Sequence, residues 1–429
     1  MGCGRNCWPS ATRRWESTVP EAIHLDDYRR VVPPQTIDLL RRLAGRVRGR
    51  SLLHVNSTRV GGGVAEMLSR YVPLFEELGV PVRWDVISGA EEFFRVTKSL
   101  HNALQGQEQA FTAEMLAAYL ETNRENAARL HLDSDVVIIH DPQPAALIVF
   151  TRRPASAGTG REGGRWVWRC HIDVSRPQRR AWAFLRQFVT RYDGAIFSLP
   201  KFAQQLPLPQ YLIYPSIDPL SEKNRDLTAE EVAATLDRLG VPRDKPILLQ
   251  VSRFDRFKDP IGVINAYRLV KKHDDCRLVL VGGPADDDPE GAQVLAEVMG
   301  AAQGDADIHI LVLPPAAHYE VNALQRAASI IVQKSTREGF GLTVAEGMWK
   351  GKPVIGGHAG GITEQIIEGV TGYTVNSVEG CAYRARYLLH NPALASQMGH
   401  HGREYVRERF LITRDLAEHL ALMVTLLNA

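Results

Sequence analysis

The sequence predicts an α/β protein built from two doubly wound, Rossmann-like domains. The first observation is a series of short apolar runs without polar alternation, such as Val136-Val137-Ile138-Ile139, which suit parallel strands buried on both faces. The second is that these runs alternate with glycine-containing turns and amphipathic stretches. The third is that the pattern restarts near residue 245, so that the two halves of the chain are alike.

The expected elements follow this pattern in order. In the first half, strands are expected at 51–55, 135–139, 166–170 and 194–199, with a helix over 64–78. The turn-rich stretch 214–220 ends this half, and the charged stretch 221–245 is expected to form a linker and cap. In the second half, strands are expected at 245–251, 276–281, 308–313, 329–332, 353–355 and 373–375, with helices over 260–272 and 291–302.

The composition of the chain limits the classes of partner that the protein can bind. The 429 residues carry a formal net charge of +2, which excludes a nucleic-acid partner held by bulk charge. No apolar run reaches the length of about 18 residues typical of a membrane helix, so no membrane partner is expected. Five cysteines are too few for a disulfide scaffold. Residues 1–18 are expected to be a flexible lead without the apolar core of a secretory signal, and the expected compartment is the cytoplasm.

A glycine-rich turn follows the first expected strand. It has the sequence Asn56-Ser57-Thr58-Arg59-Val60-Gly61-Gly62-Gly63. Glycines let backbone amides approach an anion, and a helix N-terminus adds donors and partial positive charge. The pattern is neither a Walker loop nor GxGxxG, so a phosphate-binding loop and an ordinary turn both stay open.

Two cations follow the first strand of the second half. The segment Ser252-Arg253-Phe254-Asp255-Arg256-Phe257-Lys258 places Arg253 and Lys258 at the carboxyl end of that strand, where open α/β sheets bind ligands. Arginine holds phosphate oxygens through two parallel hydrogen bonds, and lysine adds a point charge. This favours stabilisation of a departing diphosphate over the alternative, Asp–Arg pairs within a solvated loop.

Two glutamates flank a later glycine-containing loop. The segment is Glu338-Gly339-Phe340-Gly341-Leu342-Thr343-Val344-Ala345-Glu346, with a helix expected to start near Gly341. Free amides at that start suit an anion, whereas the carboxylates of Glu338 and Glu346 suit sugar and ribose hydroxyls. The alternative is that both merely compensate the helix dipole, which contributes a few tenths of a kcal/mol.

Histidines end two strands of the first half. His171 follows Arg169-Cys170, and His140-Asp141 ends the strand before it. Each suits either a sugar hydroxyl or a structural hydrogen bond, and the residues alone leave both open. Three Asp-x-Asp pairs occur, which shows how common the pattern is, and none has convincing histidine or cysteine company, so no metal site is expected; they are Asp133/Asp135, Asp286/Asp288 and Asp305/Asp307.

Taken together, these residues resemble retaining glycosyltransferases of the GT-B fold, in which two Rossmann-like domains face a central cleft. The resemblance narrows to the group of trehalose synthases and trehalose phosphorylases and covers about residues 20–410. The segments that carry it are 54–68, 92–102, 139–144, 168–173 and 333–342. It implies an acceptor domain over 19–215, a donor domain over 216–409, and a last helix at about 410–429 that returns to the acceptor domain.

The resemblance also implies the reaction: glucose passes from ADP-, UDP- or GDP-glucose to free glucose, giving α,α-trehalose with retention. Arg253, Lys258, Glu338 and His171 are then the expected catalytic residues. The expected donor-binding residues are Gly61, Gly62, Gly63, Arg253, Lys258, Val312, Leu313, Gly339, Phe340, Gly341, Leu342, Thr343 and Glu346. The expected acceptor-binding residues are Asp141, His140, Lys98, Asn102 and Asp173.

The nucleotide sugar is a co-substrate, no cofactor is expected to be required, and stimulation by Mg²⁺ is compatible with this interpretation. The resemblance also implies a homodimer. A trehalose phosphorylase and a retaining hexosyltransferase with another acceptor, such as a sugar phosphate, stay open as alternatives. Two alternatives from other classes are a nucleotide-sugar epimerase, which needs an acid/base set, and a non-catalytic sensor, which never releases nucleoside diphosphate.

Overall fold

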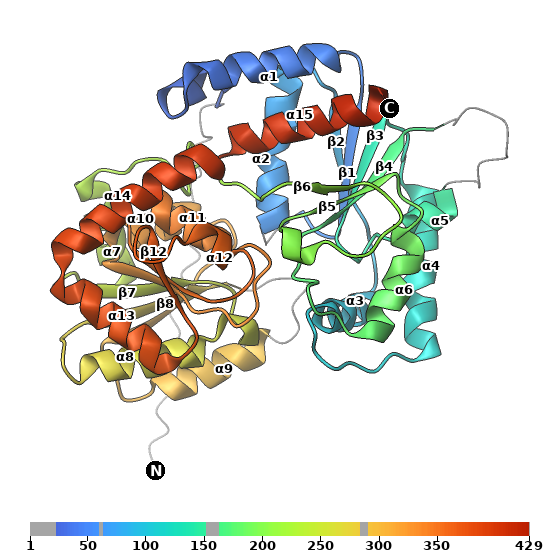
Figure 1. The fold of residues 1–429 in the computed structure, drawn as a ribbon. Helices are drawn as coiled ribbons and strands as arrows, with labels where there is room; N and C mark the ends of the chain where they lie inside the picture. The colour runs from blue at the N-terminus through green and yellow to red at the C-terminus, as the bar shows by residue number, and fades with distance from the viewer. Residues whose placement is uncertain (1–22, 60–62, 152–162, 284–290, 429) are drawn as a thin grey trace.

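The computed structural model describes residues 23–59, 63–151, 163–283 and 291–428. Two lobes, each built on a parallel sheet of six strands, lie side by side (Figure 1). The first sheet consists, in spatial order, of β2 (Val82–Val86), β1 (Leu52–Asn56), β3 (Val136–His140), β4 (Arg165–Cys170), β5 (Gly194–Phe197) and β6 (Gln210–Leu212). The second consists of β12 (Gly372–Val375), β11 (Val354–Gly357), β10 (Ile330–Gln333), β7 (Ile247–Val251), β8 (Arg277–Gly282) and β9 (Ile308–Val312).

Helices cover both faces of the first sheet. Because side chains alternate along a strand, Leu52 and Ile138 face one side and Leu53 and Ile139 the other. The first side is packed by α1 (Pro34–Arg46), α2 (Gly63–Glu77) and α15 (Ile412–Asn428). The second is packed by α3 (Glu91–Leu104), α4 (Ala113–Arg129), α5 (Leu147–Thr151) and α6 (Arg179–Val189).

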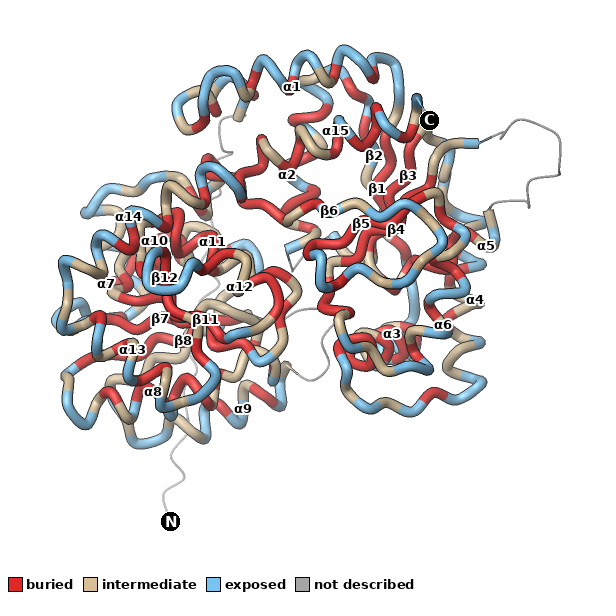
Figure 2. Tube along the Cα trace, in the orientation of Figure 1, coloured by how far each residue is buried: buried red, intermediate tan, exposed pale blue. Residues whose placement is uncertain are grey.

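The second sheet is covered in the same way. One face packs against α7 (Ala229–Leu239), α10 (His318–Ala327), α11 (Leu342–Trp349) and α14 (Pro392–Arg409). The other packs against α8 (Pro260–Lys271), α9 (Gly291–Ala302) and α13 (Val378–His390). The short α12 (Ile362–Gln365) follows β11. The strands form the buried centre of each lobe and the helices its surface (Figure 2), so ligand-binding groups are left to the loops at the strand ends.

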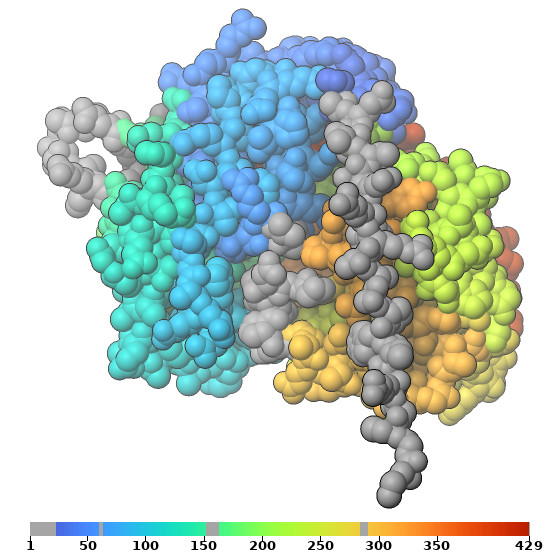
Figure 3. Space-filling view, turned by 180° about the vertical axis from the view of Figure 1, so that it is seen from behind, coloured from blue at the N-terminus to red at the C-terminus, as the bar shows by residue number. Residues whose placement is uncertain are grey.

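The chain crosses between the lobes at two places that lie side by side. The Ile217 amide donates to the Phe410 carbonyl at 2.9 Å, and the Ile412 amide donates to the Ile217 carbonyl at 2.9 Å. After this second crossing α15 runs onto the first lobe and packs against α1 and α2 (Figure 1). From behind, the blue and cyan lobe and the yellow and orange lobe lie next to each other (Figure 3).

The predicted fold class is confirmed. Every expected strand is present, with ends within two residues of those expected, and the helices at 63–77, 260–271 and 291–302 match their predictions. The sequence interpretation missed β2 and β6, because β2 is only partly buried and β6 is a three-residue edge strand. The domain boundaries stay predictions, and the lead at 1–18 lies outside the described residues. Among the helices of the described ranges, none combines the length and apolar character needed to cross a membrane.

Candidate active site

A short loop after β7 carries the two predicted phosphate-binding cations. The Asp255 carboxylate accepts a hydrogen bond from the Phe257 amide at 2.7 Å and so caps a single 3-10 turn, η3 (Arg256–Lys258). Asp259 adopts a left-handed conformation with φ of 49° and caps α8 through the Gly262 amide at 3.0 Å. The loop conformation is therefore fixed by side-chain caps, and it directs Lys258 toward the neighbouring loop after β10.

Lys258 contacts the first of the two predicted glutamates. Its Nζ donates to Oε2 of Glu338 at 2.6 Å, and the Ser335 hydroxyl donates to the same oxygen at 3.0 Å. The other oxygen, Oε1, has no hydrogen-bond partner in the described part of the chain. Glu338 is thus a buried carboxylate with one oxygen bound by a cation and one that can accept a hydrogen bond from a ligand hydroxyl.

The first lobe reaches this loop through α3. Lys98 Nζ lies 3.7 Å from Oδ2 of Asp255, across the junction of the lobes. Burial alone raises the pKa of Asp255, but Lys98, the Phe257 amide, Arg253 and Lys258 together lower the pKa below its ordinary value. Burial, Lys98 and Arg253 lower the pKa of His101 to about 3. Three cations, Lys98, Arg253 and Lys258, therefore act on the same loop, which suits an anionic ligand.

Two glycines mark where the lobes touch. A Cβ on Gly339 would lie 2.2 Å from the His171 carbonyl oxygen, and a Cβ on Gly63 would lie 2.8 Å from Cδ1 of Leu342. The first contact brings the loop after Glu338 against the end of β4. The second brings the N-terminus of α2 against the N-terminus of α11. Since α11 begins at Gly341 without a side-chain cap, its first amides are available to an anion.

The second glutamate is held by a linker residue that the sequence interpretation did not single out. Lys223 Nζ lies 2.8 Å from Oε1 of Glu346 and 3.0 Å from Oε2 of Glu66 on α2. Gln325 donates to the other Glu346 oxygen at 3.0 Å. Burial raises the pKa of Glu346, but Lys223 and Lys350 outweigh it and lower the pKa. Glu346 is thus an ionised, buried carboxylate tied to both lobes through Lys223.

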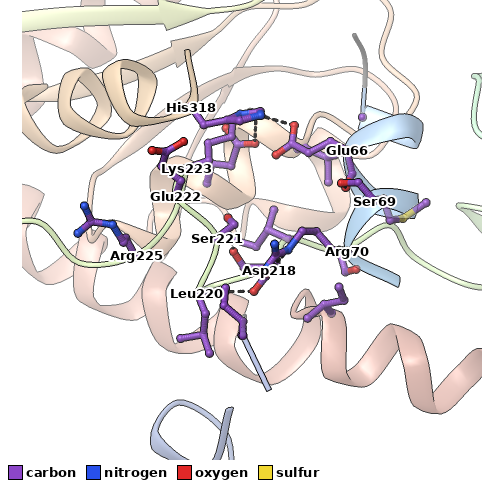
Figure 4. Close-up of a pocket in the computed structure, with 18 of the residues that line it drawn as sticks. Glu66, Ser69, Arg70, Asp218, Leu220, Ser221, Glu222, Lys223, Arg225 and His318 are labelled. Atoms are coloured by element: carbon purple, nitrogen blue, oxygen red, sulfur yellow. Dashed lines mark hydrogen bonds and ion pairs between the residues drawn. The ribbon is translucent and has the colours of Figure 1, made fainter. Parts of the chain in front are cut away.

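These groups line a cavity of about 560 Å³ between α2, the linker and α11 (Figure 4). In the close-up the Lys223 side chain reaches from the linker toward Glu66, with Arg70 and Asp218 below it. Arg70 Nε lies 2.6 Å from Oδ2 of Asp218. Gly63, Leu342 and Glu346, all predicted donor-binding residues, line this cavity, whereas Arg253, Lys258 and Glu338 do not. The candidate site therefore has two parts, the cavity at Glu346 and the cationic loop at Lys258, joined by the start of α11.

The predicted acceptor residues of the first lobe divide into two groups. His140 Nδ1 lies 2.9 Å from His171 Nε2, and the Asp141 carboxylate accepts the His171 amide at 2.8 Å, so these three form one unit at the strand ends. Asp173 instead accepts from the Ser175 amide and hydroxyl at 2.9 and 2.6 Å. Asn102 is buried on α3 beside Lys98.

The remaining predicted donor residues are placed as follows. Val312 is exposed at the end of edge strand β9, and the Leu313 amide donates to the Gly282 carbonyl at 2.8 Å. The buried Phe340 ring packs against Phe410 and Tyr214 at the crossing, so only its backbone can serve the site. The Thr343 hydroxyl donates to the Val251 carbonyl at 3.1 Å. Gly61 and Gly62 lie outside the described residues.

Two functional candidates were missed by sequence reasoning. Lys223 stands in a charged stretch, and no local pattern marks it as the partner of Glu346. His54 was part of a recognised segment but not a predicted site residue, although its Nδ1 lies 2.9 Å from Nε2 of His140. Within the described ranges no group of three or more histidine, cysteine, aspartate or glutamate side chains is placed to hold a metal ion.

Comparison with known proteins adds to this geometry. The family described as "Trehalose synthase, N-terminal domain" matches residues 54–204, and "Glycosyl transferases group 1" matches residues 233–405. The chain is 46% identical over 408 residues to the trehalose synthase of Pyrococcus horikoshii, covering 94% of this chain and 96% of that protein. It is 28% identical to the trehalose phosphorylase of Pleurotus pulmonarius, covering 93% of this chain but only 60% of that longer protein.

Solved structures agree in fold. The chain superimposes on an α,α-trehalose-phosphate synthase (UDP-forming) from Burkholderia xenovorans, solved in complex with glucose-6-phosphate, with a TM-score of 0.70. The identity is 15%, and the match covers 87% of this chain and 100% of that one. At this identity the likeness establishes the two-domain glycosyltransferase fold alone.

Proposed function

Because the chain belongs to the trehalose synthase family of GT-B glycosyltransferases, we propose that it transfers glucose from a nucleoside diphosphate glucose to free glucose, giving α,α-trehalose with retention. The observation that carries this proposal is the Lys258–Glu338 pair. It combines a cation for a phosphate oxygen with a carboxylate for a sugar hydroxyl, and the loop that follows it packs against His171 of the opposite lobe. A nucleotide sugar presents these two groups, a diphosphate and a sugar, next to each other.

The diphosphate is assigned to Arg253 and Lys258. Lys258 donates to Glu338, and its ammonium has further N–H groups that can donate to a phosphate oxygen. The uncapped amides at the start of α11 and the adjacent N-terminus of α2 add donors on the same side. Stabilising a departing diphosphate in this way accelerates bond breaking, because the negative charge develops in the transition state.

The sugar and the ribose are assigned to the two glutamates. Oε1 of Glu338 is the oxygen available to a glucose hydroxyl. Glu346 lines the cavity of about 560 Å³, where its carboxylate is suited to the ribose hydroxyls. Since Lys223 holds Glu346 ionised, the carboxylate accepts hydrogen bonds and does not donate them.

A neutral acceptor is supported by the pairing of cations at the junction of the lobes. Lys98 faces Asp255 at 3.7 Å, and Arg337 faces Asp173 at 3.8 Å. Lys201 donates to the Gly360 carbonyl and the Thr363 hydroxyl, both at 2.9 Å. A phosphorylated acceptor would have to share these three cations with the polar partners that they already hold. Free glucose needs only hydroxyl partners, which His171 and Asp141 are placed to provide.

The proposed chemistry uses same-face attack. The bond between the glucosyl anomeric carbon and the diphosphate oxygen breaks, and a bond from that carbon to an acceptor hydroxyl oxygen forms on the same side. The leaving phosphate oxygen takes the hydroxyl proton, so the products are trehalose and nucleoside diphosphate. Arg253 and Lys258 neutralise the negative charge of the leaving diphosphate, and no covalent nucleophile is assigned.

Mg²⁺ is not assigned a step, because Arg253 and Lys258 neutralise the diphosphate. Activity that persists in excess EDTA is the expected result.

Proton NMR of product mixtures tests the proposal. The protein is incubated with ADP-, UDP- or GDP-glucose and unphosphorylated glucose in phosphate-free buffer, with glucose-6-phosphate as a parallel acceptor. The symmetric α,α-trehalose anomeric signal, with release of nucleoside diphosphate, is the expected result. Product only with glucose-6-phosphate assigns another acceptor. Trehalose breakdown that requires inorganic phosphate, without synthesis from any nucleotide sugar, assigns the phosphorylase activity instead.

A further inference from the structure

Three histidines form a row across the first sheet. His54 lies on β1, His140 on the neighbouring strand β3, and His171 directly after β4. His54 Nδ1 lies 2.9 Å from His140 Nε2, and His140 Nδ1 lies 2.9 Å from His171 Nε2. His54 and His140 are buried, whereas His171 is partly exposed beside Gly339 of the second lobe. The row therefore leads from the interior of the first lobe to the candidate active site.

The sheet makes this row possible. His140 stands opposite Arg169 in the parallel register of β3 and β4, and His54 stands opposite Ile138. Because side chains alternate, His54 and His140 share the face of Ile138, which α2 and α15 cover. His171 is two residues beyond Arg169. Three neighbouring parallel strands thus place three imidazoles in a row, each within hydrogen-bond distance of the next.

A second buried network, formed by Arg169, His419 and Asp415, lies at the interior end of the row. Arg169 Nη1 lies 2.6 Å from Nε2 of His419 on α15, and a guanidinium can only donate, so this imidazole nitrogen accepts. The Nδ1–H of His419 then points at Asp415, 2.9 Å from its carbonyl oxygen and 3.0 Å from its carboxylate. Tyr71 and Ser216 donate to Oδ2 of this carboxylate. Arg169 is therefore a buried cation whose partner is a histidine in a single tautomer.

The three histidines of the row are neutral. Burial lowers the pKa of His54, His140 and His171 well below the ordinary value, and the charge of Arg169 lowers each further. Each of the two N···N contacts holds one proton, so only two arrangements of protons satisfy the whole row. In one, each histidine carries its proton on Nδ1; in the other, each carries it on Nε2.

The surroundings of His54 distinguish the two arrangements of protons. Its Nε2 is buried and has no hydrogen-bond partner within the described ranges. A proton on this nitrogen would be a buried donor without an acceptor, which proteins avoid more strictly than an unused acceptor. The proton of His54 therefore lies on Nδ1, and the same holds along the row.

We propose that His54 and His140 are positioning residues that hold His171 as a neutral imidazole with its proton on Nδ1, the nitrogen left for a substrate oxygen. His171 is then a hydrogen-bond donor to that oxygen and neither a general base nor a cation. The identity of the oxygen, a glucose hydroxyl, rests on the proposed function. The tautomer does not depend on it.

Nitrogen NMR of ¹⁵N-histidine-labelled protein tests the tautomer directly, because a protonated and an unprotonated imidazole nitrogen have well-separated chemical shifts. The expected spectrum of the wild-type protein shows His171, assigned with His171→Gln, protonated on Nδ1 from pH 6 to pH 8. A bare Nδ1 with the proton on Nε2 overturns the proposal. This readout needs no turnover, so a protein that makes no trehalose but shows the Nδ1 proton contradicts the proposed function and leaves the tautomer standing.

Variants of His140 test the coupling. His140→Gln keeps one acceptor and one donor, whereas His140→Phe removes both. His140→Phe is expected to lose the Nδ1 tautomer of His171 and to lower kcat about 10- to 100-fold, with a smaller change in KM, as loss of an orienting partner does for other functional histidines. His140→Gln is expected to retain the tautomer and most of kcat.

Tyr192→Phe is the matched control. It removes a buried hydrogen bond of 2.8 Å to the Ala145 carbonyl on the opposite face of the same sheet, so it reports general destabilisation only. Equal loss of kcat in His140→Gln and His140→Phe, or an unchanged tautomer in His140→Phe, contradicts the coupling. If His140→Phe does not fold, the spectrum of the wild-type protein decides alone.

Discussion

Lys258 and Glu338 contact each other at 2.6 Å, although 80 residues separate them in the chain. Lys258 stands after β7 and Glu338 after β10, and these two strands are neighbours in the second sheet. The pair brings together one residue expected to bind phosphate and one expected to bind sugar. Because an ammonium has three N–H donors, Lys258 can bind a ligand phosphate and keep its contact with Glu338, whose Oε1 accepts a hydrogen bond from a ligand hydroxyl.

The first prediction concerns the leaving group. Arg253→Ala and Lys258→Ala are each expected to lower kcat by about 10²-fold or more, as loss of a charge-stabilising donor does in other enzymes. Steady-state release of nucleoside diphosphate measures the effect. Lys245→Ala is the control. It removes a lysine that pairs with Asp307 at 2.9 Å at the amino ends of the strands of the same sheet, so this variant should keep the wild-type rate. Near-normal turnover in both site variants would exclude the phosphate assignment.

The second prediction separates the two glutamates. Glu346→Gln is expected to raise the KM for the nucleotide sugar with little change in kcat, because ribose contacts are made in both ground and transition states. Glu338→Gln is expected to lower kcat instead. Lys223→Met should resemble Glu346→Gln, since Lys223 holds this carboxylate at 2.8 Å. Small and equal effects of both glutamine variants would assign the glutamates to helix-dipole compensation.

Much of this arrangement follows from local sequence. Unalternating apolar runs predicted the central strands, and Lys258 and Glu338 lie together because they follow neighbouring parallel strands that end at one edge of the second sheet. His171 follows a strand of the first sheet. The edge strand β6 was missed because three residues without burial leave no periodic signal. Sequence spacing therefore predicts which residues reach the carboxyl edge of each sheet.

What the sequence does not contain is the relationship between the lobes. The contact of Gly339 with His171 and the bridge from Lys223 to Glu346 depend on how two independently predictable sheets are docked. The role of Phe340 was assigned from its place in a motif, whereas its ring packs with Tyr214 at the crossing. Contacts between residues more than 100 positions apart leave no periodicity in a single sequence.

The third prediction concerns the contact between the lobes. Gly339→Ala places a methyl group 2.2 Å from the His171 carbonyl oxygen, so the lobes must separate or the loop must shift. We expect kcat to fall at least tenfold with little loss of stability, since the added methyl group meets the opposite lobe and not the core of either sheet. Gly300→Ala, in helix α9 with nothing within 4 Å of the added Cβ, is the control and should raise stability by about 0.5–1 kcal/mol. Full activity in Gly339→Ala would show that this approach is not needed for turnover.

The last prediction concerns pH and the anchoring of α15. Asp415 is buried; burial raises the pKa of its carboxyl, but His419, Arg169 and Arg414 outweigh this and lower the pKa far below the ordinary value of about 3.9. A group with a depressed folded-state pKa stabilises the protein above its unfolded-state pKa and loses this contribution as pH falls through and below that value.

Asp415→Asn is therefore expected to destabilise the protein by about 3 kcal/mol near pH 7, the usual effect of breaking a buried charged network. The difference in unfolding free energy between Asp415→Asn and the wild-type protein should shrink as the pH falls below about 4. In that range the Asp415 carboxylate binds a proton in the unfolded wild-type protein, so its low pKa in the folded protein no longer favours folding fully. Urea unfolding at a series of pH values measures it. Glu418→Gln, one turn along the same helix at a carboxyl whose pKa burial raises, is the matched control, and its difference from wild type should not shrink in this way. A pH-independent effect of Asp415→Asn would mean that Asp415 acts through packing and not through its charge.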